Sequence, residues 1–347
     1  MITENESRGS TLMARRTEIE KKIDIIEDDI AAIDPALLKL LLQDKTTRGN
    51  ILWGTKDYEN YGSEYEEYKP MDVKLITGAL STVIQPRAAK SKEIQRTRIR
   101  DRAEVFTPSW VCNEQNSLVD EAWFERKNVF NIPEGTSWIT TKETISFPEG
   151  KGWKAYVDAN RLEITCGEAP YLVSRYDTTT GELIPLYERI GLFDRKMRIV
   201  EENCISDEEW LKWSQRAIQS VYGYEFQGDS VLVARENLLY DYIDYYKGHF
   251  SKEPPLKLLK EIANIIAWNI WQMDGLKYVV PYSCHETIEV EAQINLFGTE
   301  ESTVVPCPGC EKQDMFRHNG IYCRIFDWKN LKKSIPFISL FKEGSNG

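Results

Sequence analysis

Apolar residues recur every three or four positions near the start of the chain, and a nearly continuous apolar run from Leu37 to Leu42 follows them. The recurring positions are Ile19, Ile23, Ile26, Ile30 and Ile33. This spacing predicts an amphipathic helix within residues 11–45, or two helices broken near Asp34-Pro35. The same kind of pattern predicts helices at 207–220 and 256–265, and a strand is expected from Asn50 to Trp53.

Three further strands are predicted in the second half of the chain. They cover 161–165, 221–226 and a short segment that ends in Asp274-Gly275. After the first strand, Cys166-Gly167 and the small residues Ala169 and Pro170 predict a tight turn and the first turn of a helix. Gly228-Asp229 opens another helix after the second strand. Strands that alternate with helices indicate an α/β fold, and open α/β sheets bind cofactors at such turns.

Acidic residues stand at or near the ends of these strands. Small residues in the first turn let the backbone approach a ligand, and Glu163 can accept hydrogen bonds there. Glu225, at the end of the second strand, has the two oxygens that suit a ribose diol. Asp274 can accept from the exocyclic amine of an adenine, although capping its own turn is an alternative role. Glu225 follows the first turn by about 60 residues instead of the usual ~20, so 176–220 contains inserted structure.

The segment RLEITCGEAPYL, residues 161–172, resembles the S-adenosylmethionine (SAM) binding loop of adenine-specific DNA methyltransferases. The pattern of that family is acid, Pro, any, Cys, Gly, any, Gly, any, Phe, Leu. Matching positions are Glu163, Cys166, Gly167, Leu172 and, with an aromatic exchange, Tyr171. The chain departs from the pattern at Ile164, where the family has Pro, and at Ala169, where it has its second Gly.

Other motifs resemble the same family and occur in the family's order. Phe106-Thr107-Pro108 resembles the motif that lies against the methionine end of SAM, and it also looks like a helix start with Thr107 as the cap. Tyr224-Glu225 resembles the second motif. The resemblance implies a Rossmann-like methyltransferase sheet. It also implies a cofactor site formed by Phe106, Thr107, Pro108, Glu163, Thr165, Cys166, Gly167, Ala169, Glu225, Phe226, Asp274 and Gly275.

The catalytic tetrapeptide of the family, an Asn, Asp or Ser followed by Pro-Pro and an aromatic, does not occur in this sequence. The one Pro-Pro pair, Pro254-Pro255, is followed by Leu256 and opens a helix. The sequence ends about where the family would begin the catalytic strand. We therefore expect the M subunit of a restriction-modification system, completed by a second subunit that carries the tetrapeptide and recognises double-stranded DNA. The alternative is a non-catalytic scaffold with a methyltransferase fold.

The formal net charge of −11 makes the chain a poor DNA binder by itself, because non-specific affinity comes from Lys and Arg. A local exception is the basic run from Gln85 to Arg102, which is either a solvated surface or a phosphate contact. No apolar run approaches the ~20 residues that span a bilayer, and the first residues do not resemble a signal peptide. These features predict a cytoplasmic protein without a membrane contact.

Four soft ligands stand close together near the end of the chain. Cys307, Cys310, His318 and Cys323 have a spacing that suits a structural zinc, with reduced thiols as the alternative. Cys284-His285 could compete for one ligand position. A zinc-stabilised nucleic-acid binding module is therefore a third class of function to consider.

The patterns divide the chain into three parts. Residues 1–102 form a helical and basic extension. Residues 103–280 form the SAM-binding domain, with insertions at 123–158 and 176–215. Residues 281–347 carry the candidate zinc site.

Overall fold

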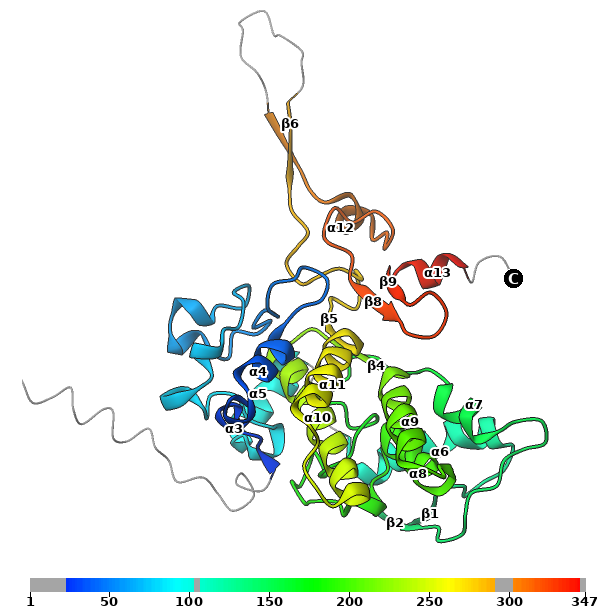
Figure 1. Cartoon of the computed structure of the whole chain (residues 1–347). Coiled ribbons are helices and arrows are strands. Elements are labelled where there is room, and N and C mark those ends of the chain that lie inside the picture. Colours follow the sequence, from blue (N-terminus) through cyan, green and yellow to red (C-terminus); the bar gives the residue numbers. More distant parts are fainter. Residues whose placement is uncertain (1–22, 103–106, 291–301, 344–347) are drawn as a thin grey trace, which may run out of the picture.

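The computed structural model describes residues 23–102, 107–290 and 302–343. These residues form a mixed α/β structure of helices, one three-stranded sheet and three two-stranded sheets (Figure 1). The helices are α3 (Glu27–Ile33), α4 (Pro35–Leu42), α5 (Lys92–Arg102), α6 (Ser109–Phe124), α7 (Trp153–Asp158), α8 (Leu192–Asn203), α9 (Asp207–Gln219), α10 (Gly228–Phe250), α11 (Leu256–Asn269), α12 (Pro308–Lys312) and α13 (Ser339–Glu343). The strands are β1 (Asn131–Glu134), β2 (Ser137–Thr140), β3 (Arg161–Glu163), β4 (Val221–Glu225), β5 (Ile270–Gln272), β6 (Thr287–Val290), β7 (Ser302–Val305), β8 (Arg324–Asp327) and β9 (Lys333–Pro336).

The central sheet has the order β3-β4-β5, and all of its strands are parallel. Arg161 pairs with Val221 at one side of β4, and Gly223 pairs with Ile270 at the other. Helices α8 and α9 connect β3 to β4, and α10 and α11 connect β4 to β5. Every residue of β4 and β5 is buried, as expected for parallel strands covered on both faces.

Several predictions from the sequence are confirmed. The N-terminal helix breaks at Asp34, whose side chain accepts a hydrogen bond from the Ala36 N–H at 2.7 Å and caps α4. A helix follows Pro108, and the helices predicted at 207–220, after Gly228 and at 256–265 are α9, α10 and α11. The predicted part of the N-terminal helix before residue 23 lies outside the described residues.

Two predictions about local structure are wrong. Residues 164–176 form turns and no helix, because Thr165, Gly167 and Ala169 have φ values of 45°, 53° and 62°. The segment from Asn50 to Trp53 makes only isolated bridges. At Leu52 the backbone bonds to the Gln272 side chain in place of a neighbouring strand. Leu52 N donates to Gln272 Oε1 at 2.7 Å, and Gln272 Nε2 donates to Leu52 O at 2.9 Å.

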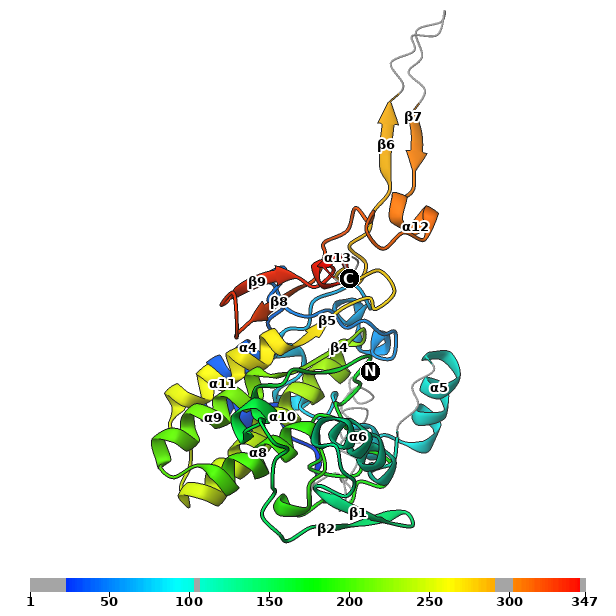
Figure 2. The same cartoon turned by 90° about the vertical axis from the view of Figure 1, so that its right-hand side faces the viewer.

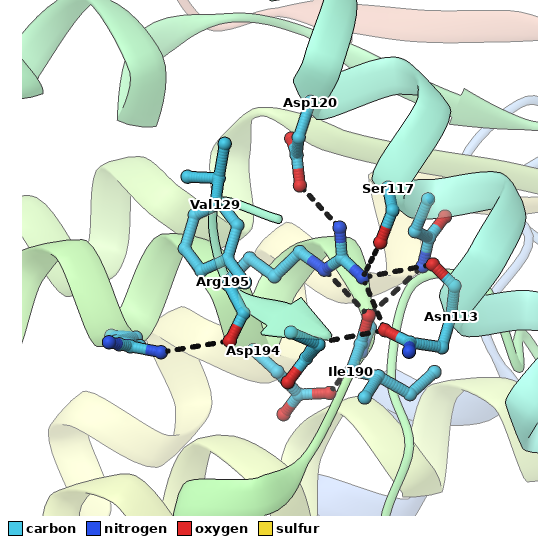
Figure 3. Close-up of polar contacts among 12 residues, drawn as sticks. Asn113, Ser117, Asp120, Val129, Ile190, Asp194 and Arg195 are labelled. Atoms are coloured by element: carbon cyan, nitrogen blue, oxygen red, sulfur yellow. Dashed lines mark hydrogen bonds and ion pairs between the residues drawn. The ribbon is translucent and has the colours of Figure 1, made fainter. Parts of the chain in front are cut away.

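A buried arginine fixes α6 against α8 (Figure 3). Arg195 donates to the Asp120 carboxylate, to Asn113 Oδ1 at 2.7 Å and to the Ile190 carbonyl at 3.1 Å. A buried guanidinium requires such a set of acceptors, because an unpaired charge in the core is strongly destabilising. The contacts determine where the start of α6, with Thr107 and Pro108, lies.

The basic run at 85–102 does not present all of its cations to solvent. Arg98 is buried and donates to both oxygens of Asp229, at 2.7 and 3.1 Å. Lys90 Nζ lies 2.9 Å from the same carboxylate, and the Tyr58 hydroxyl donates to it at 2.7 Å. Two cations of the run therefore serve as internal partners of the first turn of α10, a role that neither interpretation of the charge pattern included.

The C-terminal part contains two antiparallel hairpins. The β6–β7 hairpin projects away from the helical body in both views (Figures 1 and 2), and the β8–β9 hairpin lies beside β5. In the part of the chain that the structure describes, no helix has both the length and the apolar character needed to cross a bilayer.

We expect Asp229→Asn to lower the free energy of unfolding by about 3–5 kcal/mol, because the change removes the buried carboxylate shared by Arg98 and Lys90, while the other carboxylate near Arg98, that of Asp57, lies 3.4 Å from its Nε. Urea denaturation monitored by circular dichroism measures the loss. The double variant Asp229→Asn with Arg98→Met should recover part of this loss, because the buried guanidinium is gone. A loss below about 1 kcal/mol in the single variant would contradict the ion network as a source of stability.

The pH dependence of this network has a definite sign. Burial raises the pKa of Asp229, but the charges of Arg98 and Lys90 outweigh burial and hold it well below its usual value. A depressed pKa stabilises the fold above the unfolded-state value, and the contribution is lost as the pH falls through the lower folded-state value. The free energy of unfolding of the Asp229→Asn variant should therefore be lower than that of the wild type at neutral pH. The two values should approach each other in strong acid, as measured by urea denaturation at both pH values.

Candidate functional site

The carboxyl ends of β3, β4 and β5 meet at one edge of the sheet. Cys166 N donates to the Tyr224 carbonyl at 2.9 Å, and Gly167 N donates to the Glu225 carboxylate at 3.0 Å. Met273 N donates to the Glu225 carbonyl at 2.9 Å. The turn after β3 therefore lies directly against the end of β4, with the end of β5 on the other side of β4.

Gly275 lies close to the end of β4. A Cβ atom added there would stand 2.9 Å from Cε2 of the Tyr224 ring, so a side chain at this position would clash with the ring. Asp274 and Gly275 are thus held beside Tyr224-Glu225, as the three predicted strand ends require. Phe226, which follows Glu225, places its ring 5.6 Å from that of Tyr282.

The turn after β3 has an unusual backbone. Thr165, Gly167 and Ala169 all have positive φ, a conformation that costs an L-residue roughly 1–2 kcal/mol and glycine little. Ala169, with φ 62°, occupies the position where the resembling family has its second Gly. The Ala at this position therefore keeps the backbone conformation that favours glycine.

The start of α6 lies beside the chain that follows this turn. Ser109 N donates to Asp177 Oδ2 at 2.7 Å, and Asn116 Nδ2 donates to the Tyr171 carbonyl at 2.9 Å. The Thr178 hydroxyl donates to the Thr107 carbonyl at 3.3 Å. Thr107 and Pro108 are thereby brought close to the turn, whereas Phe106 lies outside the described residues. Pro108 occupies the helix cap position where Thr107 was predicted.

The strand-end carboxylates also bind the backbone around them. Glu163 accepts from the N–H groups of Leu172 at 3.1 Å and Tyr171 at 3.4 Å. Burial raises the pKa of Glu163 well above its usual value, against the effect of these hydrogen bonds, and the nearby charge of Glu225 raises it further. The carboxyl groups at the ends of β3 and β4 are therefore electrostatically coupled.

Asp274 caps its own turn, which is the alternative role that the sequence left open. Its Oδ1 accepts from Leu276 N at 3.1 Å and from Lys277 N at 3.2 Å. Its Oδ2 lies 3.4 Å from Lys277 Nζ. A ligand contact by Asp274 would therefore be made by a carboxylate that the turn already holds in a fixed orientation.

A second site is formed by Cys284, Cys307, Cys310 and His318, whose ligand atoms all lie within 4.8 Å of one another. The three sulfurs lie 3.5, 3.6 and 3.6 Å from His318 Nδ1. A tetrahedral zinc with ordinary Zn–S and Zn–N bonds separates such atoms by about 3.6 Å. The cluster therefore has the ligand set and the spacing to hold a structural metal such as zinc.

Close backbone approaches support this geometry. A Cβ atom on Gly309 would stand 2.6 to 2.7 Å from atoms of His318, and one on Gly320 would stand 3.0 Å from Cys284 Sγ. Burial raises the pKa of Cys307, but backbone N–H groups, first that of Asn319, lower it to about 6. The thiolate form that a metal requires is thus favoured at this position.

The predicted ligand Cys323 is wrong, and Cys284 takes its place. Cys323 is buried in a cluster that includes Tyr224 and Met273, and its Sγ lies 3.3 Å from the Gln272 carbonyl. Cys284 stands three residues before β6, and Cys307 stands two residues after β7. Pairing of the two strands brings these cysteines together, so a hairpin prediction for 287–305 was the signal that would have favoured Cys284, named from the sequence as a competing ligand, over Cys323.

The metal-ligand cluster is connected to the end of β5. Tyr278 N donates to the Asp274 carbonyl at 2.7 Å, and Cys323 N donates to the Tyr278 carbonyl at 3.0 Å. Val280 N donates to the Ile321 carbonyl at 2.8 Å. The segments that carry Cys284 and His318 therefore lie against the turn that carries Asp274.

No family model, curated protein or solved structure matches the chain.

We expect the purified chain to contain one zinc ion per molecule, measured by inductively coupled plasma mass spectrometry. Cys284→Ser should lose the metal, because it removes one of the ligands around the ion. Cys323→Ser is the matched control and should retain the metal, because Cys323 binds a backbone carbonyl instead. If Cys284→Ser retained zinc and Cys323→Ser lost it, the result would support the ligand set predicted from the sequence, which includes Cys323.

Proposed function

We propose that this chain is the SAM-binding subunit of a DNA adenine-N6 methyltransferase of a restriction-modification or phage-defence system. The observation that carries the proposal is the hydrogen bond from Gly167 N to the Glu225 carboxylate at 3.0 Å. It joins the turn that resembles the SAM loop to the residue that resembles the ribose ligand. These residues are 58 positions apart in the chain.

The surroundings of this contact support a Rossmann-like cofactor site. The parallel strands are neighbours in chain order, and their carboxyl ends are where open α/β sheets bind ligands. In the proposed complex Thr107 and Pro108 pack on the methionine part of SAM and the turn from Glu163 to Ala169 surrounds the cofactor. Glu225 holds the ribose, and Asp274 holds the adenine.

The charge of the site suits the cofactor. SAM carries a sulfonium and an ammonium group, and Glu163 and Glu225 place two carboxyl groups at the junction of β3 and β4. When bound, SAM supplies an electrophilic methyl group to the exocyclic amine of adenine. The chain contributes position and electrostatic complementarity, and no general base is assigned to it.

The acceptor half of the reaction belongs to another polypeptide in this proposal. The sequence contains no Asn-Pro-Pro-aromatic tetrapeptide, whose polar side chain and Pro carbonyl orient the target amine. A second subunit that carries it and recognises double-stranded DNA completes the site. This division also accommodates the net charge of −11, because the partner provides the cations for DNA binding.

We expect SAM to bind the purified chain in isothermal titration calorimetry. Glu225→Gln and Asp274→Asn should each weaken binding about 10- to 100-fold, because each removes a charged hydrogen-bond acceptor worth roughly 1.5–3 kcal/mol. Glu134→Gln, an exposed position in β1, is the control and should leave the affinity unchanged. Thermal unfolding without SAM tests whether each variant is folded, and equal affinity in all four proteins would remove the assignment.

A non-catalytic scaffold is the second candidate, favoured by the carboxylates of Glu163 and Asp274 that already bind their own backbone. Transfer of labelled methyl groups to adenine-containing duplex DNA distinguishes the two. We expect transfer only when the polypeptide encoded beside this chain is added. No transfer with or without that polypeptide, together with absent SAM binding, would favour the scaffold.

A further inference from the structure

A cavity of about 360 Å³ lies between the loop after α4, helix α11 and the β8–β9 hairpin. Lys45, Arg48 and Arg324 line it together with Trp268, and no carboxylate belongs to its described lining. The Arg324 N–H donates to Thr46 Oγ1 at 3.0 Å, which joins the hairpin to the loop. A cavity with three cations and no anion is unexpected in a chain with a net charge of −11.

The described hydrogen bonds of Lys45 and Arg324 go to neutral acceptors. Lys45 Nζ donates to the Gln43 and Asn264 side-chain oxygens, at 2.5 and 2.8 Å. Arg324 donates to the Ser334 carbonyl at 2.7 Å and to its hydroxyl at 3.1 Å. Asp44 is the nearest carboxylate along the chain, but it caps the turn by accepting from Thr46 N and Thr47 N. No described hydrogen bond of Lys45 or Arg324 from the cavity wall therefore reaches a carboxylate, and both cations are placed to meet an anionic ligand.

Further observations agree with a missing anion. Burial, together with the charge of Arg235, lowers the pKa of Lys45 to about 8, which is the effect of a cation without a counter-ion. Trp268 is held by a ring contact with Phe326 at 5.5 Å. An indole beside guanidinium groups suits a planar base with an attached phosphate, since every base can stack on an aromatic ring.

We propose that this cavity binds a nucleoside phosphate, with the phosphate between Lys45, Arg48 and Arg324 and the base against Trp268. The volume falls within the range of small-ligand sites. Arginine suits phosphate because its planar fork donates two hydrogen bonds to one group. The site lies against α11 and the β8–β9 hairpin, and none of its lining residues belongs to the turn after β3.

Calorimetry of the full chain with AMP, adenosine and inorganic phosphate tests the proposal, with SAM present at saturation to occupy the other site. AMP should bind at least ten-fold more tightly than either adenosine or inorganic phosphate. Arg48→Gln and Lys45→Gln should each weaken AMP binding at least ten-fold. Lys39→Gln, an exposed lysine on α4, is the matched control and should bind as the wild type does.

Each remaining outcome decides one part of the proposal. Trp268→Leu should reduce the affinity for AMP to that for inorganic phosphate, and an unchanged affinity for AMP would overturn the placement of the base. Equal weakening in the Lys39→Gln control, or no AMP binding at millimolar concentration, would overturn the site. Glu225→Gln should leave AMP binding unchanged, so the loss of SAM binding and the loss of AMP binding are separate results.

Discussion

Buried cations at the amino ends of the central strands hold the sheet together. Strands of three to five residues form few ladder hydrogen bonds, so side chains must supply further contacts. Arg235 donates to the carbonyls of Ile270 at 2.8 Å and Gln43 at 3.0 Å, which joins the start of β5 to the end of α4. Lys196 donates to the carbonyls of Val157 and Ala159 and to the Ser220 hydroxyl, which joins the starts of β3 and β4.

These cations fix the opposite end of the sheet as well. Burial lowers the pKa of Arg235 to about 10 and lowers the pKa of Lys196 well below its usual value. Keeping either side chain charged in the core therefore costs free energy. Carbonyl acceptors offset that penalty only when the strands are in register. The register then brings Glu163 and Glu225 to one edge, where the charge of Glu225 helps to raise the pKa of Glu163. The acidic edge is thus a consequence of how the amino ends are anchored.

The sequence predicted the features whose cause is local. The break at Asp34-Pro35, the helix after Pro108 and the three parallel strands follow from capping residues and alternation, and the structure has all of them. Contacts between distant residues had no such signal. The pairing of Arg98 with Asp229 joins positions 131 apart, so the basic run looked like a surface. Cys284, which the sequence offered only as a competitor for one ligand position, joins the possible metal-ligand cluster through the pairing of β6 with β7.

The cluster of Cys284, Cys307, Cys310 and His318 is joined to the end of the central sheet. Three sulfurs and one imidazole nitrogen would fill a tetrahedral shell around a metal, as in structural zinc sites. The ligands stand at the base of the β6–β7 hairpin, and the segments around them bind the turn after β5 through Tyr278 and Val280. Cys323 N donates to the Tyr278 carbonyl beside that turn, and Cys323 Sγ donates to the Gln272 carbonyl at the end of β5. A metal at this position would therefore stabilise the turn that carries Asp274, because the strand end and the ligand segments share the same hydrogen bonds.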